Sequence, residues 1–251
     1  MTAVQEPVQA TDPRTALADE FRLAVADPAD ARQVARFYQY SRALAADLAD
    51  WHTTPLRRQW TDIIVETAKL NGARSVLDVG CGRGDDLAAL HAAGMTNLIG
   101  IEPNAQMAVA EAATVYPLLS DAVAQQIADS GGCDLGICID VLEHLPDPAG
   151  QLDLLSRCIP VGGLLFEATA TTDVETPLHL KSNWGWSPVS QLQSLGFVQA
   201  HAWDRLRLWE RVSETAAPFP SILMAVWRGM ENRTLDCVLR TIRPRAGFPR
   251  G

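Results

Sequence analysis

Residues 75–87 read Ser-Val-Leu-Asp-Val-Gly-Cys-Gly-Arg-Gly-Asp-Asp-Leu, and this stretch decides the fold. Its first part, 76–79, has the apolar, β-branched composition of a buried strand. A turn with three glycines, Gly80–Gly84, follows, and a helical pattern begins at Asp85. Glycine permits positive φ and close approach of a ligand to backbone N–H groups, and a helix N-terminus favours an anionic group. The stretch therefore predicts a nucleotide-like ligand at the carboxyl edge of a parallel sheet.

The spacing of the glycines and of the acidic residues after them narrows the kind of ligand. Dinucleotide sites carry G-x-G-x-x-G, whereas this turn reads G-x-G-x-G, with Asp78 two residues before the first glycine. Glu102 ends the next strand-like run, where a carboxylate can accept two hydrogen bonds from a ribose diol. Asp121 comes one βα unit later, and a fourth strand-like run at 134–139 leads into Asp140–Leu145.

This ordered series resembles the class I S-adenosylmethionine-dependent methyltransferases, in particular the broad group that acts on small molecules. A Rossmann-like domain with another adenosine ligand is the alternative. The resemblance implies an α/β fold, namely a Rossmann-like, seven-stranded, mostly parallel sheet with helices on both faces and an N-terminal helical cap. It also implies S-adenosyl-L-methionine as cofactor, S-adenosyl-L-homocysteine as product, and a small-molecule acceptor methylated on oxygen or nitrogen.

The same resemblance assigns roles to individual residues. The glycine turn and Asp78 would surround the methionine end of the cofactor, Glu102 would bind its ribose, and Asp121 with the Ala122 backbone would face its adenine. Ser120-Asp121 also fits a plain helix N-cap. The residues expected at the cofactor are Asp78, Gly80, Cys81, Gly82, Gly84, Glu102, Pro103, Asp121, Ala122 and Asp140.

Methyl transfer from a sulfonium is an in-line displacement, in which the protein aligns the acceptor and excludes water. A hydroxyl acceptor benefits from a general base, whereas an amine needs only to arrive deprotonated. His179, His144 and Asp140 are the expected catalytic residues, and Glu143 is a further group that could serve. For both histidines a structural role is the alternative: a scaffold role for His144, and a bond to a backbone carbonyl for His179.

Three aromatic residues are expected to bind the acceptor. Trp184 and Trp186 enclose a glycine in the long segment after the fifth expected strand, where they could stack on a flat substrate. They fit equally well as anchors that pack the following helix on the core. Tyr38 belongs to an apolar helical face near the N-terminus, within the expected cap.

Composition excludes several classes of protein. The formal charge of −9 argues against a nucleic-acid partner, and no apolar run approaches the roughly 18 residues that span a bilayer. The N-terminus lacks the pattern of a signal peptide, and the odd number of cysteines, with no C-x-x-C pair, favours reduced thiols in a cytoplasmic protein without a metal. For the metal-free site, a catechol-type metal site is the alternative. For the small-molecule acceptor, the alternative is a carrier-bound, peptide or RNA acceptor. For the enzyme, the alternative is a regulator that binds the cofactor without catalysis.

The expected organisation has four parts: a disordered N-terminus at 1–13, a helical cap at 14–70, the methyltransferase core at 71–230 and a basic tail at 231–251. Helices that merely brace the sheet are the alternative for 14–70. Within the core, strands alternate with helices, which predicts a parallel sheet covered on both faces. The strands are expected at 76–79, 98–102, 116–119, 134–139, 163–169, 197–203 and 221–228, and the helices at 85–93, 104–113, 121–129, 148–158 and 188–195.

Overall fold

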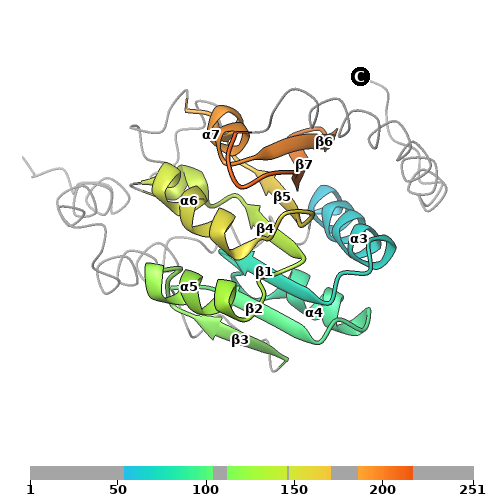
Figure 1. Cartoon of the computed structure of the whole chain (residues 1–251). Coiled ribbons are helices and arrows are strands. Elements are labelled where there is room, and N and C mark those ends of the chain that lie inside the picture. The colour runs from blue at the N-terminus through green and yellow to red at the C-terminus, as the bar shows by residue number, and fades with distance from the viewer. Residues whose placement is uncertain (1–53, 104–111, 146, 171–185, 217–251) are drawn as a thin grey trace, which may run out of the picture.

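A single seven-stranded sheet organises the computed structural model, which describes residues 54–103, 112–145, 147–170 and 186–216 (Figure 1). The strand order is β3-β2-β1-β4-β5-β7-β6. The first five strands run parallel, and β7 is antiparallel to both of its neighbours. This confirms the predicted α/β fold. The strands are β1 Ser75–Val79, β2 Asn97–Ile101, β3 Ala113–Tyr116, β4 Leu135–Ile139, β5 Leu164–Ala168, β6 Phe197–Trp203 and β7 Leu206–Arg211.

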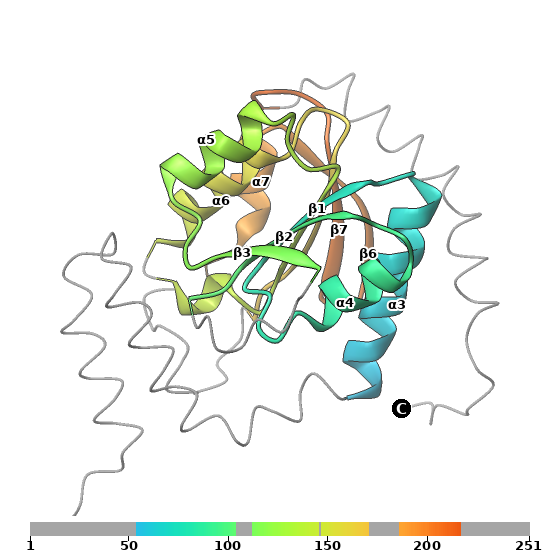
Figure 2. The same cartoon turned by 90° about the horizontal axis from the view of Figure 1, so that it is seen from below.

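Helices cover both faces of this sheet (Figure 2). One face carries α3 (Pro55–Leu70) and α4 (Asp85–Ala92), and the other carries α5 (Asp121–Asp129), α6 (Pro148–Cys158) and α7 (Pro188–Ser194). A short 3₁₀ helix, η3 (Leu142–His144), follows β4. Each face has its own apolar core, with Trp60 and Ile64 of α3 buried on one side and Leu152 and Leu155 of α6 on the other.

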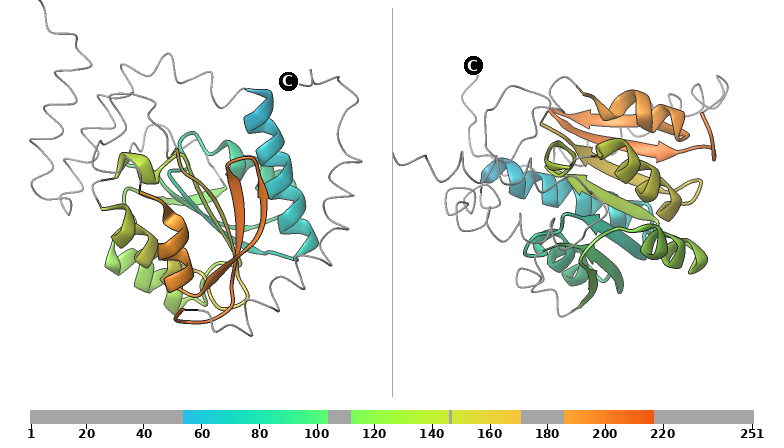
Figure 3. Two further views of the ribbon diagram at one scale, coloured as in Figure 1. Left: turned by 90° about the horizontal axis from the view of Figure 1, so that it is seen from above. Right: turned by 90° about the vertical axis from the view of Figure 1, so that its left-hand side faces the viewer.

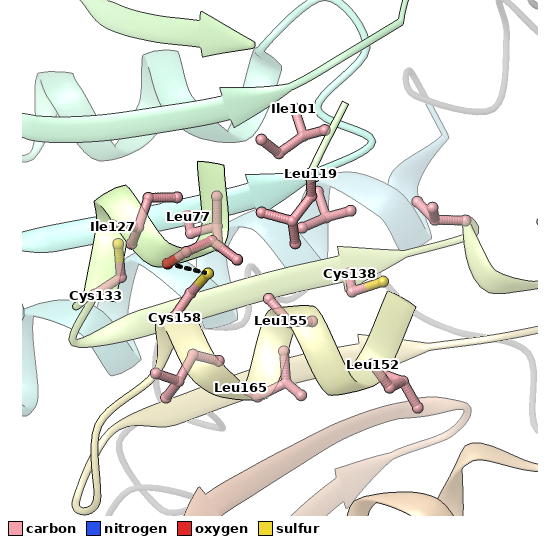
Figure 4. Packing of buried hydrophobic residues seen from close by; sticks show 14 of the residues in the cluster. Leu77, Ile101, Leu119, Ile127, Cys133, Cys138, Leu152, Leu155, Cys158 and Leu165 are labelled. Carbon is pink, nitrogen blue, oxygen red and sulfur yellow. Dashed lines mark hydrogen bonds between the residues drawn. The ribbon is translucent and has the colours of Figure 1, made fainter. Parts of the chain in front are cut away.

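The core between the sheet and the second group of helices also holds cysteines (Figure 4). Cys133, Cys138 and Cys158 are buried there with free thiols, and Cys81 is buried in the glycine turn. Burial raises the pKa of Cys133 to about 12 and that of Cys158 to about 11. These thiols therefore stay protonated at neutral pH and behave as small apolar side chains.

Capping residues explain why several helices begin where the sequence predicts. The Thr54 hydroxyl accepts a hydrogen bond from the Arg57 N–H at 3.2 Å, with Pro55 as the first helical residue. The Asp147 carboxylate likewise accepts from the Gly150 N–H at 2.9 Å, ahead of α6. Each cap satisfies a backbone donor that the first helical turn leaves open. The predicted ranges 121–129 and 148–158 are confirmed.

Two predicted strands lie elsewhere. The strand expected at 116–119 is β3 at Ala113–Tyr116, because Pro117 lacks the N–H that a continuing strand requires. The reversed seventh strand, expected at 221–228, is β7 at Leu206–Arg211. It follows β6 after the two-residue turn Asp204-Arg205, in which Asp204 takes a φ of 56°. The segment 221–228 lies outside the described residues, as does most of the helix expected at 104–113.

The described part of the expected N-terminal cap is α3. This helix packs against the sheet with Trp60, Ile63, Ile64 and Ala68 buried, and the cap at 14–70 stays a prediction. The rest of the expected cap, including Tyr38, and the tail 231–251 lie outside the described residues. No helix within the described ranges has both the length and the apolar content to cross a membrane.

Candidate functional site

The glycine turn lies where β1 ends, at the carboxyl edge of the sheet (Figure 3). Gly80, Gly82 and Gly84 have φ angles of 75°, 54° and 79°, a region that side-chain-bearing residues rarely adopt. At Gly80 a Cβ atom would come within 2.3 Å of the Val141 side chain, so the segment after β4 packs directly on the turn. At Gly82 a Cβ atom would meet nothing within 4 Å. Gly82 is buried, but there is room beside it where a side chain would lie.

Glu102, directly after β2, ties the turn to the neighbouring strand. Its Oε2 atom accepts a hydrogen bond from the Gly82 N–H at 3.1 Å, and the residue is only 6% exposed. The N–H groups of Gly80 and Cys81 both donate to the carbonyl of Ile101, at 2.8 and 3.1 Å. The carboxylate that the sequence assigns to a ribose is therefore held beside the glycine turn.

Asp78 lies beneath this turn, in surroundings that strongly disfavour a negative charge on its own carboxyl group. It is 4% exposed. Burial raises its pKa well above the usual range, repulsion from Asp86 and Glu102 raises that pKa further, and Arg57 opposes the shift. The balance of charge around Asp78 is negative, so a cationic group bound here would be stabilised.

Arg57 and Asp86 form a buried ion pair between α3 and α4 that the sequence motifs do not reveal. Two guanidinium nitrogens of Arg57 donate to the two carboxylate oxygens of Asp86, and the Thr61 hydroxyl donates to the same carboxylate at 2.6 Å. Burial, the largest single influence, lowers the pKa of Arg57, but the charge and hydrogen bonds of Asp86, together with the charges of Asp78 and Asp140, outweigh it and the net shift is upward. Asp86 stands in the first turn of α4, two residues after Gly84, so this pair fixes the helix that ends the turn.

Asp140 and Glu143 occupy the equivalent edge position after β4. Asp140 has a φ of 55°, its N–H donates to the Ala168 carbonyl at 2.8 Å, and Arg205 holds its carboxylate with nitrogen–oxygen distances of 2.5 and 3.3 Å. Glu143 is 3% exposed, and its Oε1 accepts from the Ala170 N–H at 2.9 Å. Burial, followed by repulsion from Asp140, raises the pKa of Glu143 to about 7.

The structure brings some of the expected catalytic residues together and leaves others untested. Asp140, Glu143 and His144 share one short segment after β4, with His144 partly exposed at the end of η3. His179 and Trp184 lie outside the described residues, so their roles stay predictions. Within the described ranges, no group of three or more His, Cys, Asp or Glu side chains is arranged to hold a metal ion.

Asp121 and Trp186 have surroundings that also fit their alternative interpretations. The Asp121 side chain is 87% exposed and pairs with Arg157 of α6 at 2.7 Å, while Ser120 caps α5 by accepting from the Val123 N–H at 3.3 Å. Trp186 is partly buried and packs against the core cluster ahead of α7. The adenine role of Asp121 and Ala122 and the acceptor role of Trp186 stay predictions.

Comparison with known proteins places the chain in a family. The model of a methyltransferase domain matches residues 51–208. A ubiquinone biosynthesis O-methyltransferase of Pseudomonas aeruginosa (strain UCBPP-PA14) is 36% identical over 125 residues, covering 46% of this chain and 50% of that protein. The protein of the same name from Thiobacillus denitrificans is 33% identical over 132 residues, covering 49% and 54%. The chain thus spans about half the length of the curated relatives it matches.

Among solved structures, a putative caffeoyl-CoA O-methyltransferase from Staphylococcus aureus aligns with a TM-score of 0.49 at 10% identity, covering 80% of this chain and 99% of that one. The family model spans more than half of the chain, and it includes the glycine turn, Glu102 and the segment after β4. The chain therefore belongs to the methyltransferase domain family, within the class I S-adenosylmethionine-dependent methyltransferases.

Proposed function

We propose that this chain binds S-adenosylmethionine at the glycine turn and transfers its methyl group to an oxygen atom of a small molecule. The observation that carries the proposal is the buried carboxyl group of Asp78 beneath a glycine turn with free space beside Gly82, in an environment with an excess of negative charge. S-adenosylmethionine has a positive sulfonium and a positive ammonium group, so its charge is complementary to this environment. The family match supports the same cofactor.

The residues at the edge fit this cofactor in kind and in order. Asp78 would hold the ammonium group, and the backbone of the turn would receive the rest of the methionine end. Glu102, already oriented by the Gly82 N–H, would bind the ribose hydroxyls. Asp121 and Ala122, at the start of α5, would face the adenine. When bound, the cofactor supplies a methyl group on positively charged sulfur, ready for attack by a nucleophile.

The segment after β4 is where the chain would act on the acceptor. Asp140 is fixed by Arg205 and by the Ala168 carbonyl. His144, partly exposed at the end of η3, and Glu143, with a pKa of about 7, are described groups that could accept a proton. His179 is the second candidate base from the sequence. A hydroxyl acceptor must lose its proton during transfer, whereas the protein only has to position an amine. Relatives named O-methyltransferases support the hydroxyl.

Calorimetry and a transfer assay test the proposal in two stages. The full chain should bind both S-adenosylmethionine and S-adenosylhomocysteine, and failure to bind either one would overturn the proposal. With a cofactor carrying a radiolabelled methyl group, label should then appear on catechol or phenol and not on aniline. Transfer to aniline alone would show that the acceptor atom is nitrogen, and no transfer to any acceptor of a wider hydroxyl panel would favour a binding protein without catalysis.

A further inference from the structure

The turn between β6 and β7 reaches the same edge of the sheet as the glycine turn. Because β7 runs antiparallel to β5 and β6 runs antiparallel to β7, the end of β6 lies at the carboxyl edge with the ends of β1, β2 and β4. Figure 3 shows α3 running past this hairpin. Arg205, the second residue of the turn, is thus placed to contact residues that end other strands.

The Arg205 guanidinium is held on two sides. Its two terminal nitrogens bind the two carboxylate oxygens of Asp140, at 2.5 and 3.3 Å. It also lies over the indole of Trp60 in α3, with its central carbon 5.2 Å from the ring centre. The Arg205 side chain is 35% exposed and that of Asp140 is 22% exposed, so the pair lies at the boundary between the core and the open edge.

At this edge of the sheet the carboxyl groups outnumber the guanidinium groups that oppose them. Asp86 and Glu102 both repel the Asp78 carboxyl group beneath the glycine turn, and Arg57 opposes that repulsion. On the β4 side, Asp140 repels Glu143, and Arg205 opposes that repulsion. Arg57 is committed to Asp86 by two hydrogen bonds. Arg205 is therefore the guanidinium that binds Asp140 directly, whereas Arg57 acts on Asp140 through its charge.

We infer that Arg205 is a specificity-determining residue that sets how strongly the site prefers the positively charged sulfonium of S-adenosylmethionine over the neutral thioether of S-adenosylhomocysteine. The inference rests on the proposed function. The two ligands share their adenosine, ammonium and carboxylate groups and differ by one methyl group and one charge. A residue that only supports the fold changes both affinities alike, whereas a residue that sets the local charge changes their ratio.

The sign of the effect follows from the pair. With Arg205 present, the negative charge of the Asp140 carboxylate is balanced. This carboxylate then does not further favour S-adenosylmethionine over S-adenosylhomocysteine, which lacks the sulfonium charge. Without Arg205, Asp140, one of the residues expected at the cofactor, loses the guanidinium that binds both of its carboxylate oxygens, and its negative charge is opposed less strongly. S-adenosylmethionine then gains affinity relative to S-adenosylhomocysteine.

The experiment compares the two dissociation constants by calorimetry at pH 7.5 and low salt. Arg205→Met should raise the ratio of the constant for S-adenosylhomocysteine to that for S-adenosylmethionine by about three- to tenfold, and Arg205→Lys should keep it within about twofold of the wild-type ratio. Arg74→Met is the matched control. It removes the same charge from an exposed position just before β1, at the opposite edge of the sheet, and should leave the ratio unchanged.

A double variant keeps the test decisive if Arg205→Met lowers stability. Arg205→Met combined with Asp140→Asn removes both charges of the pair, and asparagine tolerates the positive φ of residue 140. The wild-type ratio should return in this variant. The inference is overturned if Arg205→Met weakens both ligands by the same factor, or if the double variant keeps the raised ratio. Failure of the wild-type chain to bind either ligand overturns the proposed function instead.

Discussion

The carboxylate of Glu102 accepts a hydrogen bond from the backbone N–H of Gly82, across 3.1 Å between the ends of β1 and β2. This hydrogen bond joins the glycine turn, expected at the methionine end of the ligand, to the carboxylate expected at its ribose. A change at either residue therefore alters the place of the other, and both changes have measurable consequences.

Glu102→Ala should weaken S-adenosylhomocysteine binding by about 10–150-fold, because it removes the proposed charge-assisted partner of the ribose and releases the Gly82 N–H. Calorimetry measures this loss. Glu66→Ala, in a surface ion pair with Lys69 on α3, should leave the affinity unchanged. Equal affinity of the Glu102 variant and the wild-type chain would show that this carboxylate does not hold the ribose.

Gly82→Ala should abolish or strongly weaken cofactor binding while leaving the fold intact. Gly72→Ala is its control, because both glycines have positive φ, at 54° and 64°, and neither Cβ would meet an atom within 4 Å. Backbone strain should cost each variant about 1 kcal/mol of stability in urea denaturation. If the two variants bind S-adenosylhomocysteine equally well, the open space at Gly82 is not the ligand's place.

Asp78→Asn should make the free protein more stable and its ligand binding weaker. The raised pKa of Asp78 shows that burial and repulsion from Asp86 oppose its charge, so an amide of the same shape relieves both. The same change removes the proposed partner of the ligand's ammonium group. Urea denaturation should therefore show a higher stability and calorimetry a weaker affinity. Asp62→Asn, at an exposed position, should change neither quantity. A variant with unchanged affinity would remove Asp78 from the ligand site.

Glu143 predicts a pH dependence of stability. Its pKa of about 7 in the folded state lies above the unfolded value of about 4.5, so the folded state binds the proton more tightly. This contribution to stability is complete below pH 4.5 and is lost as pH rises through 7. Glu143→Gln lacks the titration, so its advantage over the wild-type chain should grow across this range to at most about 3 kcal/mol. Parallel stability curves of the two proteins would contradict the assignment.

How far the sequence predicts this fold depends on whether the signal is local. Asp147-Pro148 fixes the start of α6 because a cap and a first-turn proline act within four residues. The sequence does not predict β7 at Leu206–Arg211, because Arg207 and Arg211 interrupt the apolar pattern of a buried strand. The structure shows why they are tolerated. Arg207 binds the buried Glu167 of β5, and Arg211 donates to the Ser156 and Ile159 carbonyls at the end of α6.

The residues of the candidate site also divide into those with a local sequence signal and those without one. The motif residues Asp78, Gly82 and Glu102 could be named because Asp78 lies within a recognisable strand and the other two come shortly after one. Arg57 and Arg205 could not be named, since their partners Asp86 and Asp140 lie 29 and 65 positions away in the chain. One signal was present for Arg57, which shares the buried face of α3 with Trp60 and Ile64 and so required a buried partner.

The strand order has a consequence for the time course of synthesis. β6 leaves the ribosome before β7, yet in the finished sheet β7 separates it from β5. Until Leu206–Arg211 has emerged, β6 has no strand to pair with in this sheet, and β5 presents an open edge to any other extended segment. Trp209, fully buried in the native core, also arrives only with this last strand. The described sheet is therefore completed by an inner strand, β7, which is inserted after both of its future neighbours have been made.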